Sequence, residues 1–163
     1  MFLKVLAIIL AILTVLYGSW NLIVSAADEL IVGRAAVIDG DTVEIGTRRV
    51  RLFGVDALEL GQVCDYKGRK WQCGYRAARD LAKWLGQATI VCRRRANSND
   101  RAVASCTKGV VDVAGWIVTN GFAVAEPRHS KSYLSEQERA RASRAGMWAS
   151  SFDLPKVWRH QHQ

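Results

Sequence analysis

Three features are missing from this sequence of 163 residues: an internal repeat, a low-complexity segment and a pair of cysteines at Cys-x-x-Cys spacing. Without a repeat or a biased segment, the chain fits one domain of ordinary size with an additional piece at an end. Without a short cysteine pair, a cysteine-based zinc site is disfavoured. Charge is also missing locally, because no acidic residue precedes Asp28 and no residue of either sign lies between Val5 and Ala27.

The uncharged N-terminal run predicts export. Lys4 precedes it, and the small residues at Ser25 to Ala27 resemble a signal-peptidase site. A buried helix is disfavoured at this position, whereas an uncleaved anchor stays open because the run is long enough to span a membrane. We therefore expect a periplasmic or extracellular protein, possessing a signal peptide or membrane anchor over residues 1–27, a folded domain over 28–158 and a polar tail over 159–163. In that tail, His160 and His162 are expected to be disordered rather than metal ligands.

Basic residues outnumber acidic ones by 23 to 15, so the formal net charge is +8 at pH 7. This excess favours polyanionic partners, although charge describes attraction and not chemistry. The basic residues form clusters at Arg48, Arg49 and Arg51, at Lys67, Arg69 and Lys70, at Arg93 to Arg95, and at Arg139, Arg141 and Arg144.

The four cysteines, which are Cys64, Cys73, Cys92 and Cys106, allow three disulfide pairings. In an exported chain we favour Cys64 with Cys73 and Cys92 with Cys106, because each pair closes a short local loop. Each bond would stabilise the fold by about 3 kcal/mol in the loop-entropy model.

Apolar runs and turn residues predict five short strands and three helices. The strands are expected over 30–38, 42–45, 50–55, 88–92 and 102–106, with a polar loop over 93–101. One amphipathic helix is expected over 74–85, a second follows Asp112 as its N-cap, and a basic helix ends at Gly146. Ser135 and Glu138 form a capping-box pattern in that third helix.

The stretch VIDGDTVEI, residues 37–45, places Asp39 and Asp41 on either side of a glycine inside a strand-forming sequence. A turn would explain these residues alone. Asp56, however, ends the strand predicted next, and a hairpin between the two strands would place Asp41 and Asp56 roughly opposite each other. Two carboxylates at neighbouring strand ends suit Ca²⁺, which prefers oxygen ligands.

Three further residues supply groups suited to phosphate chemistry. Glu59 lies just beyond Asp56 and could take a proton from water. Arg51 lies on the same hairpin, and its guanidinium fork matches two phosphate oxygens. Arg101 could supply a second fork.

The segments VIDGDTVEI and VRLFGVDALE and the arginine of NDRAVA resemble, in order and spacing, the thermonuclease (staphylococcal nuclease-like) family of calcium-dependent nucleases. The resemblance extends from about Gly33 to Trp148, through GYRAARDLAKWL, VVDVAGWIVTNGFA and EQERARASRAGMW. The insert CDYKGRKWQC resembles that of exported members with two disulfides. The fold implied is α+β, an OB-type five-stranded barrel with three helices.

The resemblance also implies an activity and a set of roles. A secreted, monomeric enzyme of this family would use Ca²⁺ to hydrolyse single-stranded or locally unpaired DNA or RNA to 3′-phosphate and 5′-hydroxyl ends. The implied roles are calcium binding by Asp41, Asp56 and the backbone carbonyl of Ala57, proton abstraction by Glu59, and phosphate binding by Arg51 and Arg101.

Several positions depart from the family pattern. Leu58 stands where a proline usually precedes the catalytic glutamate, and near Arg101 the sequence has Asn97 and Asp100 in place of the common Asp and Gly. The altered segment before Arg101 and the basic composition keep an alternative open. In that alternative, the chain is an OB-fold module that binds nucleic acid with weak turnover or none.

Overall fold

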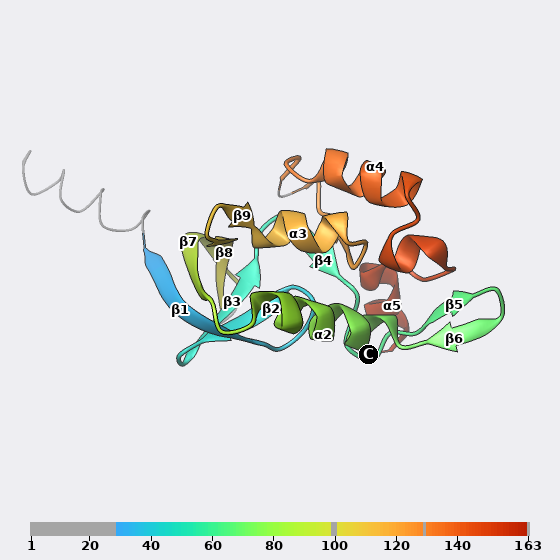
Figure 1. Ribbon diagram of the computed structural model, residues 1–163, viewed down its shortest axis with the longest axis horizontal. Coiled ribbons are helices and arrows are strands. Elements are labelled where there is room, and N and C mark those ends of the chain that lie inside the picture. Colours follow the sequence, from blue (N-terminus) through green and yellow to red (C-terminus); the bar gives the residue numbers. More distant parts are fainter. Residues whose placement is uncertain (1–28, 99–100, 129, 163) are drawn as a thin grey trace, which may run out of the picture.

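The computed structural model describes residues 29–98, 101–128 and 130–162 (Figure 1). The signal peptide or anchor expected over residues 1–27 lies outside these ranges and stays a prediction, as does the effect of Asp100. Among the described residues, no helix combines the length and the apolar composition needed to cross a membrane.

Five strands close into a mixed β-barrel, which confirms the predicted OB-type fold. They pair in the order β3-β2-β1-β7-β8, and a parallel pairing of β3 with β8 closes the barrel. A two-residue strand, β9, continues the sheet beyond β8. The bounds are Leu30–Val37 for β1, Thr42–Ile45 for β2, Arg48–Leu52 for β3, Thr89–Ser98 for β7, Arg101–Lys108 for β8 and Val111–Asp112 for β9.

The hairpin formed by β7 and β8 is longer than predicted. Instead of a polar loop over 93–101, β7 continues to Ser98 and β8 begins at Arg101, with these two residues paired. Ladder hydrogen bonds join backbone groups, so they form whatever the polarity of the side chains. The polar composition of this segment therefore led to the prediction of a loop where the structure has two strands.

Two smaller pairings lie outside the barrel. The predicted strand over 50–55 is interrupted after Leu52, and β4 (Val55–Ala57) pairs instead with β10 (Ala123–Ala125). β5 (Cys64–Tyr66) and β6 (Arg69–Trp71) form a separate hairpin.

Both predicted disulfides are confirmed. Cys64 is bonded to Cys73 across the base of the β5–β6 hairpin, and Cys92 is bonded to Cys106 across β7 and β8. Two structural disulfides are typical of an oxidising, exported compartment.

Four α-helices lie among the described residues, one more than predicted. They are α2 (Cys73–Leu85), α3 (Val113–Thr119), α4 (Leu134–Ala142) and α5 (Pro155–Gln161), with a 3₁₀ turn, η1, at Gly146–Ala149. Figure 1 shows α3 between α2 and α4. Residues 159–161, which were expected in the polar tail, belong to α5, and this helix carries Arg159 and His160.

The predicted cap of α3 is present, whereas the capping box of α4 is not. The Asp112 carboxylate accepts a hydrogen bond from the Gly115 N–H at 2.7 Å. Ser135, in contrast, lies inside α4, where its hydroxyl donates to Glu136 at 2.9 Å. The helix begins with Tyr133 at its N-cap position, so Ser135 comes too late to cap it.

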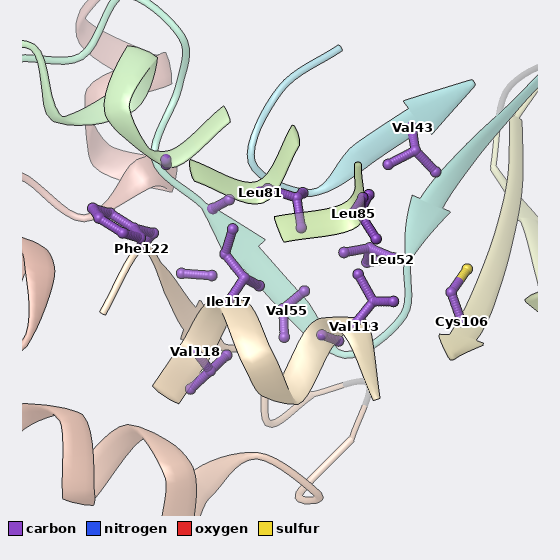
Figure 2. Packing of buried hydrophobic residues seen from close by; sticks show 14 of the residues in the cluster. Val43, Leu52, Val55, Leu81, Leu85, Cys106, Val113, Ile117, Val118 and Phe122 are labelled. Atoms are coloured by element: carbon purple, nitrogen blue, oxygen red, sulfur yellow. The ribbon is translucent and has the colours of Figure 1, made fainter. Parts of the chain in front are cut away.

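Apolar faces of the strands and helices meet in one core (Figure 2). Val43 and Leu52 point inward from the barrel, and Leu81 and Leu85 from α2 lie against them. Val113, Ile117 and Val118 of α3 cover another side, next to Val55 of β4. The helices thereby fix the position of β4, the strand that leads into the candidate site.

Candidate functional site

Asp41 sits between β1 and β2 with its carboxylate turned into the protein. The residue is 3% exposed, and the Leu52 N–H of β3 donates to its backbone carbonyl at 2.7 Å. Its Oδ2 accepts the Ala57 N–H at 2.9 Å, and its Oδ1 accepts the Thr42 hydroxyl at 3.1 Å. The segment with two aspartates is therefore more than a surface turn, because it places a buried acid where β3 and β4 meet.

Arg51 joins Asp41 to Asp56. From β3, its Nη1 lies 2.7 Å from Oδ1 of Asp41 and its Nη2 lies 3.0 Å from Oδ1 of Asp56. The two aspartates are thus brought together, although not as directly opposed residues of one hairpin. Asp56 instead pairs with Val124 of β10, and it is 5% exposed.

Glu59 follows β4 in a short loop that a buried glutamine holds in place. Gln62 is 1% exposed, and its Oε1 accepts the Glu59 N–H at 3.2 Å. The Gln62 side-chain amide donates to the Asp153 carbonyl at 2.6 Å, and its backbone carbonyl accepts the Gly74 N–H at 3.1 Å. Gln62 therefore ties the loop to α2 and to the segment before α5.

Sequence reasoning missed Gln62 because it has no chemical role of its own. A glutamine three residues after an acid is not a signal in a single sequence.

The structure explains why position 58 can carry a leucine in place of the proline usual in the family. Its side chain is 1% exposed, and its N–H donates to the Phe122 carbonyl at 3.1 Å. A proline has no N–H and could not make this bond. Here the hydrogen bond and the buried leucine hold the start of the Glu59 loop.

Arg159 is the second residue that the sequence analysis missed, and it lies at the centre of the site. Its Nη1 is 2.9 Å from Oδ1 of Asp56 and 2.6 Å from Oε1 of Glu59, and its Nη2 is 3.0 Å from Oδ2 of Asp56. Pro155 gave a helix-start signal four residues earlier. Nothing in the sequence indicated that this helix would dock beside Asp56, which lies 103 residues before Arg159 in the chain.

Asp41, Arg51, Glu59 and Arg159 line one pocket of about 300 Å³. Arg101, at the start of β8, reaches the same pocket as Arg51. Among the residues that the structure describes, no carboxylate pairs with Arg101, whereas Arg51 and Arg159 are both ion-paired. The lining residues are Asp39, Asp41, Arg51, Ala57, Leu58, Glu59, Arg101 and Arg159.

Burial and ion pairing shift the pKa values of the charged groups in opposite directions. Burial raises the pKa of Asp41 from 3.8 to about 7, although Arg51 and the Ala57 N–H lower it. The hydrogen bonds that Arg159 donates to Asp56 and Glu59 raise its pKa further above its ordinary value, so its guanidinium stays charged.

The donor chemistry of this site fits a hard cation such as Ca²⁺. Asp41 and Asp56 contact one guanidinium, so both lie within reach of a single ion, and the Ala57 backbone adjoins them. Over the described residues, no three side chains of His, Cys, Asp or Glu converge as a metal-binding group. The protein would therefore supply two carboxylates and a carbonyl, and water would complete the coordination.

Two comparisons relate the chain to known proteins. A family model described as "Staphylococcal nuclease homologue" matches residues 49–150. The succinoglycan biosynthesis protein ExoI of Rhizobium meliloti (strain 1021) is 38% identical over 130 residues, which cover 76% of this chain and 68% of that protein. The matched region includes the pocket residues from Arg51 to Arg101 and ends before α5 begins.

Proposed function

Because the chain belongs to the staphylococcal nuclease homologue family, we propose that it is a calcium-dependent nuclease that hydrolyses phosphodiester bonds of DNA or RNA. The products would carry 3′-phosphate and 5′-hydroxyl ends. The observation that carries this proposal is one pocket lined by Glu59, Arg51, Arg101 and Asp41, with Asp56 joined to it through its ion pair with Arg51.

Each side chain has a role that its position supports. Glu59, which lines the pocket and is less buried than Asp41 and Asp56, takes a proton from the attacking water. Arg51 and Arg101 reach the pocket from neighbouring strands and bind the oxygens of the phosphate, whose charge grows in the transition state. When bound by Asp41, Asp56 and the Ala57 carbonyl, calcium would supply additional positive charge to a phosphate oxygen.

Substrate selection follows from the same surface. The net charge of +8 attracts polyanions, and OB folds commonly hold single strands. A single-stranded or locally unpaired segment would enter a pocket of about 300 Å³ more readily than a stacked duplex. We further propose that residues 1–27 export or anchor the protein, which agrees with its two disulfides.

A second candidate function is supported by one observation. Arg159 forms ion pairs with both Asp56 and Glu59, so the carboxylates proposed to bind metal and to take a proton already share a cationic partner within the chain. A nucleic-acid-binding module without turnover would have this property. It would lose affinity steeply as salt is added, yet leave its substrate intact.

The test is cleavage of single-stranded DNA and of RNA with Ca²⁺ and then with a chelator, using wild-type protein and Glu59→Gln. We expect calcium-dependent cutting that Glu59→Gln lowers by at least about 10². Glu138→Gln is the matched control, since Glu138 lies on α4 and pairs only with Arg141 among the described residues. Binding without cutting by the wild type would favour the second candidate.

Succinoglycan belongs in the same assay as a second substrate. The name of the relative refers to succinoglycan biosynthesis and not to a nuclease. Cleavage of the polysaccharide with nucleic acid left intact would contradict the proposed substrate class.

A further inference from the structure

We propose that Arg159 competes with the divalent cation for Asp56, so that helix α5 sets the calcium affinity of the site. This inference rests on the proposed function, because it concerns the cation that Asp41 and Asp56 would hold. It starts from a contact outside the region matched by the family model: the guanidinium of Arg159 binds Asp56 and Glu59 simultaneously.

The hydrogen bonds of Asp56 show why the two cations exclude each other. Oδ1 of Asp56 accepts from both Arg51 and Arg159, and Oδ2 accepts from Arg159. Neither oxygen is free of a guanidinium, and within the described residues Oδ2 has no other donor. Withdrawal of Arg159 alone would therefore release one oxygen fully and leave Arg51 in place.

The charge balance of the site leads to the same conclusion. Four carboxylates, Asp39, Asp41, Asp56 and Glu59, share this region with Arg51, Arg101 and Arg159. When all seven groups are ionised, loss of Arg159 leaves two more negative than positive charges. With Arg159 the same groups carry one net negative charge, and without it a single divalent cation would neutralise the remaining two.

Helix α5 has features that would allow it to undock from the site. It has seven residues, of which only Pro155 is buried, and helices this short are not stable in isolation. Besides the ion pairs, Trp158 lies beside Gly61, with its ring 3.7 Å from where a β-carbon would be. The docked position of α5 therefore depends on the Arg159 ion pairs together with Pro155 and Trp158, and we expect this short helix to open more easily than the barrel.

Two states follow from these contacts. At low calcium, Arg159 pairs with Asp56 and Glu59 and covers the proposed general base. At high calcium, the cation takes Asp56, Arg159 withdraws, and Glu59 loses its guanidinium partner. The base would then be free to accept a proton from water.

The experiment is titration of the protein with CaCl₂ alone, followed by isothermal calorimetry. The whole chain is produced with export to an oxidising compartment so that both disulfides form. We expect Arg159→Gln to bind Ca²⁺ at least about tenfold more tightly than wild type, because it removes charge-assisted bonds that the ion must break.

Lys156→Gln is the matched control, because it removes the same charge from an exposed position of the same helix. We expect it to change the affinity less than about twofold, the scale of an exposed charge. Arg159→Lys, which retains the charge but loses the fork, should lie between wild type and Arg159→Gln.

Hydrogen exchange of the wild-type protein gives a second readout that does not depend on activity. Added Ca²⁺ should speed exchange of the backbone amides of α5 and leave those of α4 unchanged. Should Arg159→Gln unfold, this measurement on the wild type decides alone.

Each outcome decides between the proposals. Equal calcium affinities for Arg159→Gln and wild type, or unchanged exchange in α5, would overturn the competition and leave the nuclease proposal standing. Tighter binding by Arg159→Gln without any cleavage would support the competition and overturn the nuclease proposal. Absence of calcium binding in every variant would overturn both.

Discussion

At the scale of single residues, the site is governed by how a few carboxylates are neutralised. Asp41 and Asp56 are almost completely buried, and buried charges are costly unless they are paired and hydrogen-bonded. Arg51 pairs with both aspartates, and Arg159 adds a second guanidinium to Asp56. Arg101 differs, because no carboxylate of the described chain pairs with it, and it is therefore the arginine best placed to meet a phosphate.

Replacement of Arg101 by lysine tests that role. A lysine keeps the charge but cannot place two parallel donors on a phosphate, so we expect kcat to fall by at least about 10². Arg95→Lys is the control from the same hairpin, where Arg95 contacts the Ser105 hydroxyl at 3.1 Å. Equal activity of the two variants would contradict the assignment of Arg101.

The raised pKa of Asp41 predicts a pH dependence of stability. Between its ordinary value of 3.8 and about 7, the folded protein holds a proton that the unfolded chain releases. The stabilisation from this proton is complete below about pH 4 and is lost as the pH rises through 7. Asp41→Asn cannot titrate, so its free energy of unfolding should rise relative to that of wild type between pH 5 and 8.

Urea denaturation in the presence of a chelator measures this difference at each pH. A difference that stays constant across the range would show that Asp41 is ionised throughout.

At the scale of elements, the loop that carries Glu59 is held by its neighbours and not by its own sequence. Gln62 bonds to Glu59, to the start of α2 and to the chain before α5. The N-terminus of α2 approaches the loop so closely that a β-carbon on Gly74 would lie 1.6 Å from the Glu59 carbonyl oxygen. Glycine is required here by the approach of two backbones.

Gly74→Ala should therefore destabilise the protein by at least about 2 kcal/mol, because backbone must move to admit the methyl group. Gly115→Ala is the matched control in α3, where the new β-carbon would be no closer than 3.5 Å to its neighbours. This control should be neutral or slightly stabilising, since alanine favours helix. Thermal unfolding of both variants gives the comparison, and equal losses would refute the role of Gly74.

At the scale of the whole molecule, two disulfides cross-link the fold at different places. The Cys92–Cys106 disulfide joins two barrel strands away from the pocket, and the Cys64–Cys73 disulfide links the β5–β6 hairpin to the start of α2. The second link lies next to the loop that carries Glu59. The two bonds should therefore differ in their effect on activity.

Replacement of Cys92 and Cys106 by alanine should lower the free energy of unfolding by about 3 kcal/mol and leave kcat unchanged at temperatures where the variant is folded. Replacement of Cys64 and Cys73 should lower both stability and kcat, because α2 and the Glu59 loop share Gln62. Urea denaturation and cleavage assays on the two double variants test this. An equal effect on kcat would contradict it.

The local sequence pattern was sufficient to predict much of the fold. The helix over 74–85, the Asp112 cap, the disulfide pairs and the first strands all depend on residues close in sequence. The strand ends at Ser98 and Arg101 were missed because these residues pair with each other through backbone hydrogen bonds, which form despite the polar side chains. Helix α5 was missed for another reason, because its polar residues gain distant partners only after the chain has folded.

The sequence by itself determined the family, the order of Asp41, Arg51, Asp56, Glu59 and Arg101, and the disulfide pairs, because each is carried by residue type and spacing. Only the tertiary structure decided how those carboxylates are neutralised. Asp56 and Arg159 are more than one hundred residues apart, and nothing in either segment specifies their contact. That contact exists because the folded barrel presents a buried negative charge where the final helix passes, and an ion pair depends on distance in space rather than along the chain.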